Sequence, residues 1–362
     1  MLFANRQFTT VDIGSHSLKA VRMMKNKNGI NIINTGVIDI PPETLEDGKI
    51  DDVSIVASEL ATLFEKMNYS PNNVITTVAN NNLLIRNLEV PVMSEDELSE
   101  TIKWEADDQL PFPVEHARFD YIILEKGEEK IKVLLVAVKK EIIENFIAPL
   151  KKQGINPRVL NVQPMALLSL LEYQEELTEP VAILNIGASA TQVTIGTKNN
   201  IHLSRTIDTG GKDFTDTLIE GMGYSYQKAE DFKKKNGIKG QEKKEETENE
   251  DYDLDSLQIA ATGISGEDAV NTLAGSLAEE ISRSLDFFSM KNRGKKINKI
   301  YITGGGSKLK GLKEVISTEI NREVRDIETF RGIKMESTEE NDSDIFSVTV
   351  GLGISEVLAN ES

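Results

Sequence analysis

The alternation of apolar and polar residues predicts two copies of one hairpin pattern, one in each half of the chain. Residues 8–38 alternate as β-strands do, with Gly29 at a turn. Within this stretch, residues 11–18 (VDIGSHSL) read as a strand, a glycine turn and a second strand. Residues 184–191 (LNIGASAT) repeat that order of apolar, polar and small side chains. We interpret the repeat as the mark of a two-lobed α/β protein.

Apolar residues spaced three to four positions apart predict helices between the strands. Ser94 followed by Glu97 reads as a capping box, and it begins a helix that ends before Pro111. Further helices are predicted over residues 54–67, 140–152, 164–177, 213–219, 273–290, 309–320 and 346–358. Strands are predicted over residues 74–78, 83–90, 117–124, 131–138, 158–162 and 300–303.

The order of these elements predicts a nested domain organisation. We expect a first lobe over residues 1–71 and 155–179, interrupted by a compact α+β insert over residues 72–154. The second lobe is expected over residues 180–212 and 290–362, with an outer part at 213–289. Inside that outer part, residues 239–256 are almost purely charged, so we expect a solvated, mobile loop there.

Composition narrows the classes of function. The net charge of −18 repels phosphate backbones and anionic lipids, so we expect neither a nucleic-acid partner nor direct membrane insertion. The chain has no Cys and only three dispersed His, which argues against thiolate chemistry and His-based metal sites. The first residues lack the apolar core of a signal peptide. We therefore expect a cytoplasmic protein, and if it works at a membrane a partner must hold it there.

The first hairpin carries residue types that suit a phosphate group and a metal ion. Asp12 ends a strand and can hold Mg²⁺ through water. Gly14 lets the backbone approach a phosphate closely. Backbone N–H groups and side chains that suit the phosphate oxygens come from Ser15, His16, Ser17 and Lys19. An ordinary hairpin with a glycine turn remains the alternative.

The second hairpin repeats the pattern with one change of chemistry. Asn185 stands where the first hairpin has a carboxylate, and an amide cannot act as a base. This change argues against fast hydrolysis of a bound nucleotide. The turn and the residue after it provide further candidate phosphate contacts, namely Gly187, Ala188, Ser189 and Thr191. Turn hydroxyls that merely face solvent are the alternative.

Three more segments have the composition of a nucleotide site. A strand leads into Gly304, Gly305, Gly306 and Ser307, and the helix that follows favours an anion at its N-terminus. Gly210, Gly211 and Lys212 precede another helix and are a weaker candidate for the same kind of anion contact. Glu230 and Lys233 share one face of a short helix and suit ribose hydroxyls and an adenine edge, or else form a surface ion pair. None of these segments fits the P-loop or the dinucleotide fingerprint.

Taken in order, these motifs resemble the superfamily of actin, heat-shock ATPases and sugar kinases. The insert narrows the resemblance, because residues 88–93 (LEVPVM), 111–113 (PFP), 119–121 (FDY) and 134–138 (LLVAV) are similar to the PilM family of type IV pilus assembly. This resemblance covers nearly the whole chain. It implies a two-lobed actin-like fold, a duplicated ribonuclease H-like unit, with an FtsA-type α+β insert in the first lobe.

The resemblance also implies ligands and partners. ATP with Mg²⁺ would lie between the lobes, with phosphate and metal at the first hairpin and the adenosine near the glycine pairs, Glu230 and Lys233. The N-terminal cytoplasmic tail of PilN would bind in a groove between the insert and the first lobe, and the pilus motor ATPases and the platform protein are further partners. The place at which a partner holds the protein would then be the inner face of the cytoplasmic membrane. His16 departs from the pattern, since a small hydroxyl residue is expected there.

We expect a nucleotide-dependent scaffold that is at most a slow ATPase. An FtsA-like tether between a filament and the membrane is an alternative, although residues 352–362 lack the basic amphipathic pattern that such a tether needs. A small-molecule kinase of the same superfamily is the other alternative, and Asn185 removes the carboxylate that it would use as a base.

Overall fold

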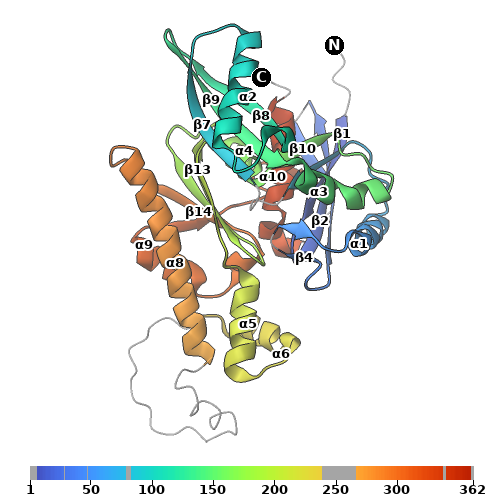
Figure 1. The fold of residues 1–362 in the computed structure, drawn as a ribbon. Coiled ribbons are helices and arrows are strands. Elements are labelled where there is room, and N and C mark those ends of the chain that lie inside the picture. The colour runs from blue at the N-terminus through green and yellow to red at the C-terminus, as the bar shows by residue number, and fades with distance from the viewer. Residues whose placement is uncertain are drawn as a thin grey trace, which may run out of the picture. The chain divides into compact units, whose positions relative to one another are not determined.

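The computed structural model describes residues 6–27, 29–46, 48–78, 83–238, 266–336 and 340–359 (Figure 1). Its contacts separate two compact units. The first unit comprises residues 1–183, 194–206 and 327–362, and the second comprises residues 184–193 and 207–326. The charged segment 239–256, predicted to be a mobile loop, lies outside the described residues.

A six-stranded sheet with the order β10-β6-β1-β2-β3-β16 forms the centre of the first unit. Its strands are β1 (Arg6–Ile13), β2 (Ser17–Asn26), β3 (Gly29–Asp39), β6 (Val74–Val78), β10 (Val159–Val162) and β16 (Lys334–Met335). The first three form an antiparallel meander, whereas β6 runs parallel to β1 and β10 runs parallel to β6. A separate two-stranded sheet joins β4 (Leu45–Glu46) and β5 (Lys49–Ile50).

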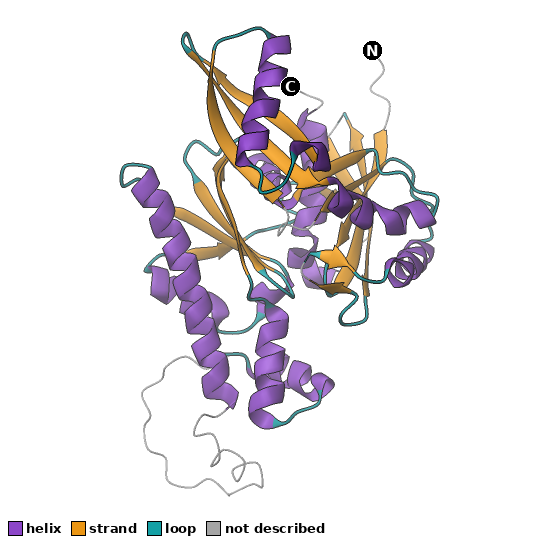
Figure 2. Ribbon diagram, in the orientation of Figure 1, coloured by secondary structure: helices purple, strands orange, loops and turns teal. Residues whose placement is uncertain are grey.

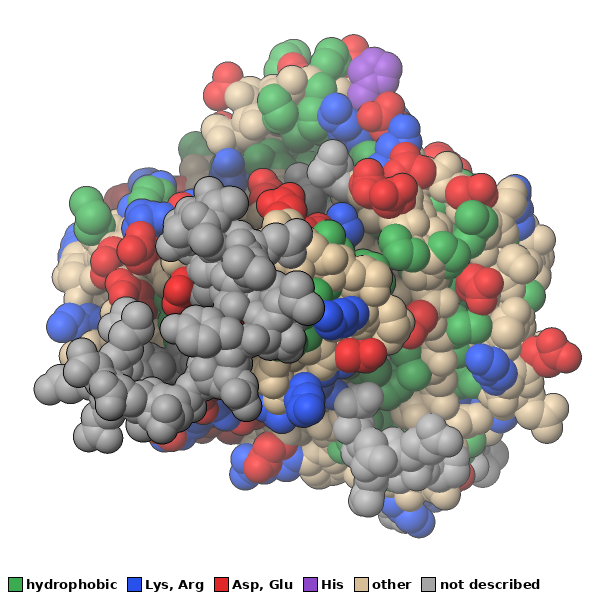
Figure 3. Space-filling model, turned by 90° about the horizontal axis from the view of Figure 1, so that it is seen from below, with side chains coloured by type: hydrophobic (Ala, Val, Ile, Leu, Met, Phe, Trp, Pro, Cys, Tyr) green, Lys and Arg blue, Asp and Glu red, His purple; other side chains and the backbone are tan. Residues whose placement is uncertain are grey.

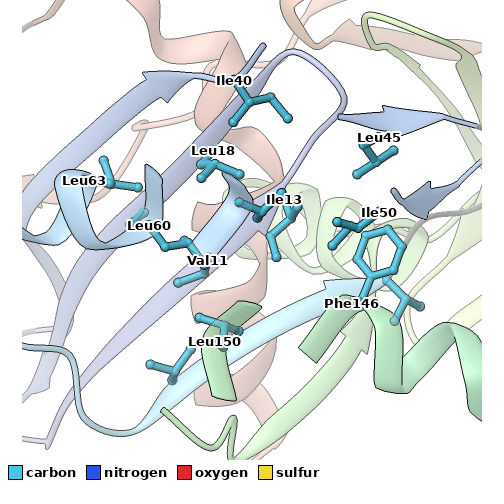
Figure 4. Packing of buried hydrophobic residues seen from close by; sticks show 14 of the residues in the cluster. Val11, Ile13, Leu18, Ile40, Leu45, Ile50, Leu60, Leu63, Phe146 and Leu150 are labelled. Carbon is cyan, nitrogen blue, oxygen red and sulfur yellow. The ribbon is translucent and has the colours of Figure 1, made fainter. Parts of the chain in front are cut away.

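Helices α1 (Val53–Lys66) and α3 (Lys140–Lys152) pack on one face of this sheet. Figure 4 shows part of this apolar core, where Val11 and Leu18 of the hairpin lie near Leu60 of α1, and Phe146 of α3 lies next to Ile50. Asp52 fixes the start of α1, because its side chain accepts hydrogen bonds from the N–H groups of the first turn. The core therefore holds the strands of the first hairpin in place.

The opposite face of the sheet is covered by α4 (Gln163–Gln174) and α10 (Ser347–Ala359). Two glycines let α10 lie close to α4 and to β2. A Cβ at Gly351 would lie 2.2 Å from the carbonyl oxygen of Ala166 in α4, and a Cβ at Gly353 would lie 2.2 Å from Sδ of Met23 in β2. Helix α10 was expected in the second lobe, but these contacts put it in the first unit. Helix α4 also ends three residues before the predicted boundary at Leu177.

A three-stranded antiparallel sheet in the order β7-β9-β8 carries α2 (Glu95–Gln109) on one face (Figure 2). The strands are β7 (Leu83–Pro91), β8 (Ala117–Lys126) and β9 (Lys130–Lys139), with a short 3₁₀ turn η2 (Val114–His116) before β8. Ser94 and Glu97 form the predicted capping box. The insert comprises fewer residues than the predicted 72–154, because β6 pairs with β1 and α3 packs in the core of the first unit.

The remaining large sheet has the order β13-β12-β11-β14-β15. Its strands are β11 (Val181–Ile186), β12 (Thr191–Thr197), β13 (Asn200–Ile207), β14 (Lys299–Thr303) and β15 (Val324–Asp326). The helices of the second unit are α5 (Gly211–Met222), α6 (Tyr226–Asn236), α8 (Gly266–Lys291) and α9 (Leu312–Ile320), with η3 (Gly305–Lys308) between β14 and α9. A further 3₁₀ segment, η4 (Glu340–Phe346), precedes α10 in the first unit.

Charged side chains of both signs lie interspersed on the face shown in Figure 3. Among the described residues, no helix is both long and apolar enough to cross a membrane.

Substituting Gly351 with Ala is expected to lower the free energy of unfolding by about 1–3 kcal/mol, because the added methyl group would overlap the backbone of α4. Urea denaturation measures the change. Gly275→Ala is the matched control: it lies inside α8, where an added Cβ meets nothing within 4 Å, so stability should stay level or rise slightly. Equal destabilisation by the two variants would contradict the close packing of α10.

Candidate functional site

The first hairpin brings four of the predicted residues together at the end of β1. Asp12 and Lys19 are direct partners in the antiparallel ladder, so their side chains point to the same face. The Nζ atom of Lys19 lies 3.3 Å from Oδ2 of Asp12 and 3.2 Å from the carbonyl oxygen of Ser17. A Cβ at Gly14 would lie 3.1 Å from this Nζ atom, so glycine leaves room for the lysine ammonium. The turn therefore holds a buried carboxylate beside a nearly buried cation.

A residue that the sequence analysis did not single out completes this group. Gln163 begins α4, and its Nε2 atom lies 3.4 Å from Oδ1 of Asp12. The two residues are 151 positions apart, and no periodicity links them. His16 lies at the exposed tip of the turn, where its Nε2 atom is 3.7 Å from Oδ1 of Asp39.

The residues at the first hairpin fit a Mg²⁺ ion that takes most of its coordinating oxygens from water and from a bound phosphate compound, not from the protein. The described residues contain no group of three or more His, Asp or Glu side chains able to hold a metal by themselves. Magnesium commonly keeps several waters and takes one or two carboxylates plus phosphate oxygens. Asp12 supplies one carboxylate of that kind, next to a lysine that suits phosphate charge.

In the second unit, the second hairpin is packed against the start of α5. A Cβ at Gly210 would lie 2.5 Å from the carbonyl oxygen of Ala188, so only glycine fits there. The N–H of Gly211 donates to the carbonyl oxygen of Gly187 (2.9 Å), and that of Lys212 donates to Ala188 (2.8 Å). Because these N–H groups already donate to backbone carbonyl oxygens, they are not available to a ligand. The segment would therefore contact a ligand by van der Waals packing and not through these donors.

The glycine triplet meets the same hairpin from another side. A Cβ at Gly304 would lie 2.4 Å from the carbonyl oxygen of Ile186 and 2.6 Å from Oδ1 of Asn185. A Cβ at Gly306 would lie 2.9 Å from the carbonyl oxygen of Gly187, and a Cβ at Gly211 would lie 3.8 Å from Cα of Gly306. Three glycine-containing segments, at 187, 210–211 and 304–306, thus converge. Gly305 lies in the middle of the triplet.

Helix α6 adds a buried ion pair to this convergence. Nζ of Lys233 lies 2.5 Å from Oε1 of Glu230, 2.6 Å from Oγ1 of Thr215 and 2.8 Å from the carbonyl oxygen of Gly211. Thr215 also donates to Glu230, and both charged side chains are nearly buried. Glu230 and Lys233 thus form the ion pair of the alternative interpretation, but the pair is nearly buried and not on the surface, because α6 packs this face on α5.

The electrostatics of Glu230 reflect two opposing effects. Burial by itself raises the pKa of the Glu230 carboxyl group. Hydrogen bonds from Lys233 and Thr215, together with the charges of Lys233 and Lys234, outweigh it, so the pKa lies below its ordinary value. Glu230 is accordingly a carboxylate at neutral pH and an acceptor of hydrogen bonds.

Several predicted contacts have structural partners instead. Thr191 is fully buried, and its hydroxyl donates to the carbonyl oxygen of Thr209 (2.7 Å). The hydroxyl of Ser307 donates to the carbonyl oxygen of Gly304 (2.7 Å). The glycine triplet leads into η3, and α9 begins only at Leu312, so the predicted helix N-terminus does not directly follow the triplet.

Comparison with known proteins identifies the family. The sequence profile described as Type IV pilus assembly protein PilM matches residues 10–247, more than half of the chain. The chain belongs to the PilM family. The fold is similar to that of a solved chain from the PilM–PilN type IV pilus biogenesis complex. The match covers 98% of this chain and 99% of the solved one, at 24% identity and a TM-score of 0.80.

More distant relatives share the actin-like fold. The profile of cell division protein FtsA matches residues 182–351. FtsA of Bacillus subtilis is 24% identical over 259 residues, which cover 64% of this chain and 58% of FtsA, less than two thirds of that relative. MreB 5 of Spiroplasma citri, solved with AMPPNP, aligns with 98% of this chain and 97% of its own at 15% identity and a TM-score of 0.52. The predicted actin-like fold is confirmed.

Glu230→Gln is expected to destabilise this PilM-family protein by about 1–3 kcal/mol at pH 7, because Lys233 would lose its buried carboxylate. The fold lowers the pKa of Glu230, so its contribution is complete above the ordinary pKa and is lost as pH falls through the lowered value. The stability difference between variant and unaltered protein should therefore shrink from pH 7 to pH 3, as measured by urea denaturation. The exposed Glu314→Gln is the control, and a difference for Glu230→Gln that stays constant with pH would contradict the assignment.

Proposed function

We propose that this PilM-family protein is a cytoplasmic ATP-binding scaffold of type IV pilus assembly. In this proposal ATP, accompanied by Mg²⁺, changes the affinity of the scaffold for the N-terminal cytoplasmic tail of PilN. The nucleotide acts by binding one conformation better than another, since a ligand with equal affinity for two states shifts neither.

The observation that supports nucleotide binding is that three glycine segments lie close together. Gly187, Gly211 and Gly306 lie within a few ångströms of one another, and Lys233 contacts the carbonyl oxygen of Gly211. Backbone without side chains can lie flat against a ligand. We assign this region to the adenosine, with Glu230 and Lys233 as the candidate ribose contacts. The solved relative that contains AMPPNP has the same fold.

In the first unit, we assign the turn at Gly14 to phosphate and Asp12 to Mg²⁺ through water. Lys19 would supply positive charge, and Ser15, His16 and Ser17 backbone donors. Mg²⁺ would neutralise phosphate charge, while Gln163 and Lys19 hold the Asp12 carboxylate in orientation. The amide of Asn185 faces the glycine triplet and offers no base, which favours a scaffold over a fast enzyme.

Asp12→Asn is expected to weaken Mg-ATP binding at least tenfold, because an amide does not bring negative charge to metal-bound water. Isothermal titration with and without Mg²⁺ measures this, and binding of ATP alone should change much less. The exposed Asp326→Asn, at the end of β15, is the matched control. Unchanged Mg-ATP affinity in a folded Asp12→Asn protein would overturn the metal assignment.

For the PilN tail, we propose the face of the insert sheet opposite α2. Phe119, Tyr121 and Ile123 of β8 pack with the α2 cluster, so Arg118, Asp120 and Ile122 face the other way. All three are exposed, and Ile122 keeps 41% of its surface accessible.

Two features of this face suit an extended peptide. Along β8 the exposed apolar side chain of Ile122 follows the charged side chains of Arg118 and Asp120, and Asp120 lies opposite the half-buried Val136 of β9. Strand β8 is also an edge strand, paired only with β9 among the described residues. An added strand can use the unpaired backbone of such an edge. The other end of this face joins the first core through Leu83 and Val138, consistent with the predicted groove between insert and first lobe.

Ile122→Asp should weaken binding of a synthetic PilN tail about tenfold, since a carboxylate would replace an apolar contact. Fluorescence anisotropy of the labelled tail gives the affinity. Val92→Asp is the control, because Val92 is an exposed aliphatic residue (52%, against 41% for Ile122) that directly follows β7. The proposed face is wrong if Ile122→Asp binds the tail normally, or if Val92→Asp loses binding to the same extent.

A further inference from the structure

The outer face of α2 presents an aromatic side chain that the fold does not use. Trp104 is the single tryptophan of the chain, and 74% of its surface is exposed. Helix α2 buries the opposite face, where Leu98, Ile102 and Ala106 pack on the insert sheet. No aromatic ring or cation of the described residues stacks on this indole. Trp104 therefore adds nothing to the core.

Carboxylates surround this indole. One helical turn away on the same face lie Glu100, Asp107 and Asp108, all of them exposed. Helix α2 carries seven acidic residues and a single Lys. Within the described part of the chain, neither Glu100 nor Asp108 takes part in an ion pair. The face thus combines a large apolar ring with unneutralised negative charge.

This combination specifies the chemistry of a partner. Exposed Trp residues are enriched among those that dominate binding energy at protein interfaces. A Lys or Arg side chain is attracted both to the face of an indole ring and to the adjacent carboxylates. Anionic lipid and nucleic acid are repelled by the same carboxylates.

The geometry points to a docking surface for a basic, Lys- or Arg-containing protein segment on the outer face of α2, centred on Trp104. This surface is distinct from the one proposed for the PilN tail, because α2 and the exposed Ile122 lie on opposite faces of the insert sheet. A partner on one face leaves the other available, so the insert can hold two segments at once.

Photocrosslinking identifies the occupant. A benzophenone amino acid replaces Trp104 in cells that assemble pili, and mass spectrometry identifies the crosslinked peptide. A second protein carries the same probe in place of Ile122. We expect position 104 to capture a segment with net positive charge that differs from the segment captured at position 122.

Binding of the captured segment, made as a synthetic peptide, then tests the contacts. In the unaltered chain, tryptophan fluorescence reports on this site alone and should change saturably on titration. Trp104→Ala should weaken binding about tenfold by anisotropy, and added salt should weaken it further. Glu100→Gln with Asp108→Gln should also weaken it, whereas the exposed pair Glu314→Gln with Glu319→Gln should not.

Four results would overturn the proposal. They are capture of an acidic or uncharged segment, capture of a second copy of this chain, capture of the PilN tail at position 104, and absence of any crosslink there. The crosslink at position 122 tests the proposed PilN face independently. A negative result at position 104 therefore overturns the α2 surface without bearing on the PilN proposal.

Discussion

Close approach of backbone segments around the second hairpin is the constraint on which the candidate nucleotide site depends. A side chain at Gly210, Gly304 or Gly306 would overlap atoms of residues 186–190. The glycines therefore have a packing role whether or not a ligand is bound. Their packing brings the start of α5 and the end of β14 to the same turn, and the contact between Lys233 and Gly211 adds α6. One steric requirement thereby brings the glycine segments of the second unit to the same turn.

Local pattern was enough to predict most elements. The strand at 74–78 and the helix at 140–152 lie where apolar spacing predicted them, because the strand is buried at every position and the helix buries one apolar face. The pairing of distant elements was not predictable in this way. Helix α10 was predicted as a helix, but it is buried nearly all round, so its apolar pattern marks no single face and does not indicate its partner. Its Gly351 matches Ala166 of α4, which lies almost two hundred positions earlier in the chain, and its Gly353 matches Met23 of β2.

The candidate site shows the same limit. Spacing correctly placed Glu230 and Lys233 on one face, but it did not show that the face is buried against Thr215 and Gly211. Gln163 could not be found from spacing, since its contact with Asp12 depends on where α4 meets the sheet. Thr191 and Ser307 had the right chemistry for phosphate, yet nearby carbonyl oxygens take their hydroxyl protons. Motif residues mark a candidate region, and tertiary contacts decide which atoms remain for a ligand.

The edge position of β8 has a consequence for how the molecule behaves in isolation. An unpaired strand edge is a template for β-sheet aggregation, and natural proteins protect such edges with charge. Arg118 and Asp120 lie exposed on β8, and Lys126 at its end pairs with Glu95. These charges disfavour parallel, in-register pairing of β8 with β8 of an identical copy, because like charges would then lie opposite each other. The strand is thus guarded against one mode of self-assembly while its backbone stays open to a peptide of different sequence.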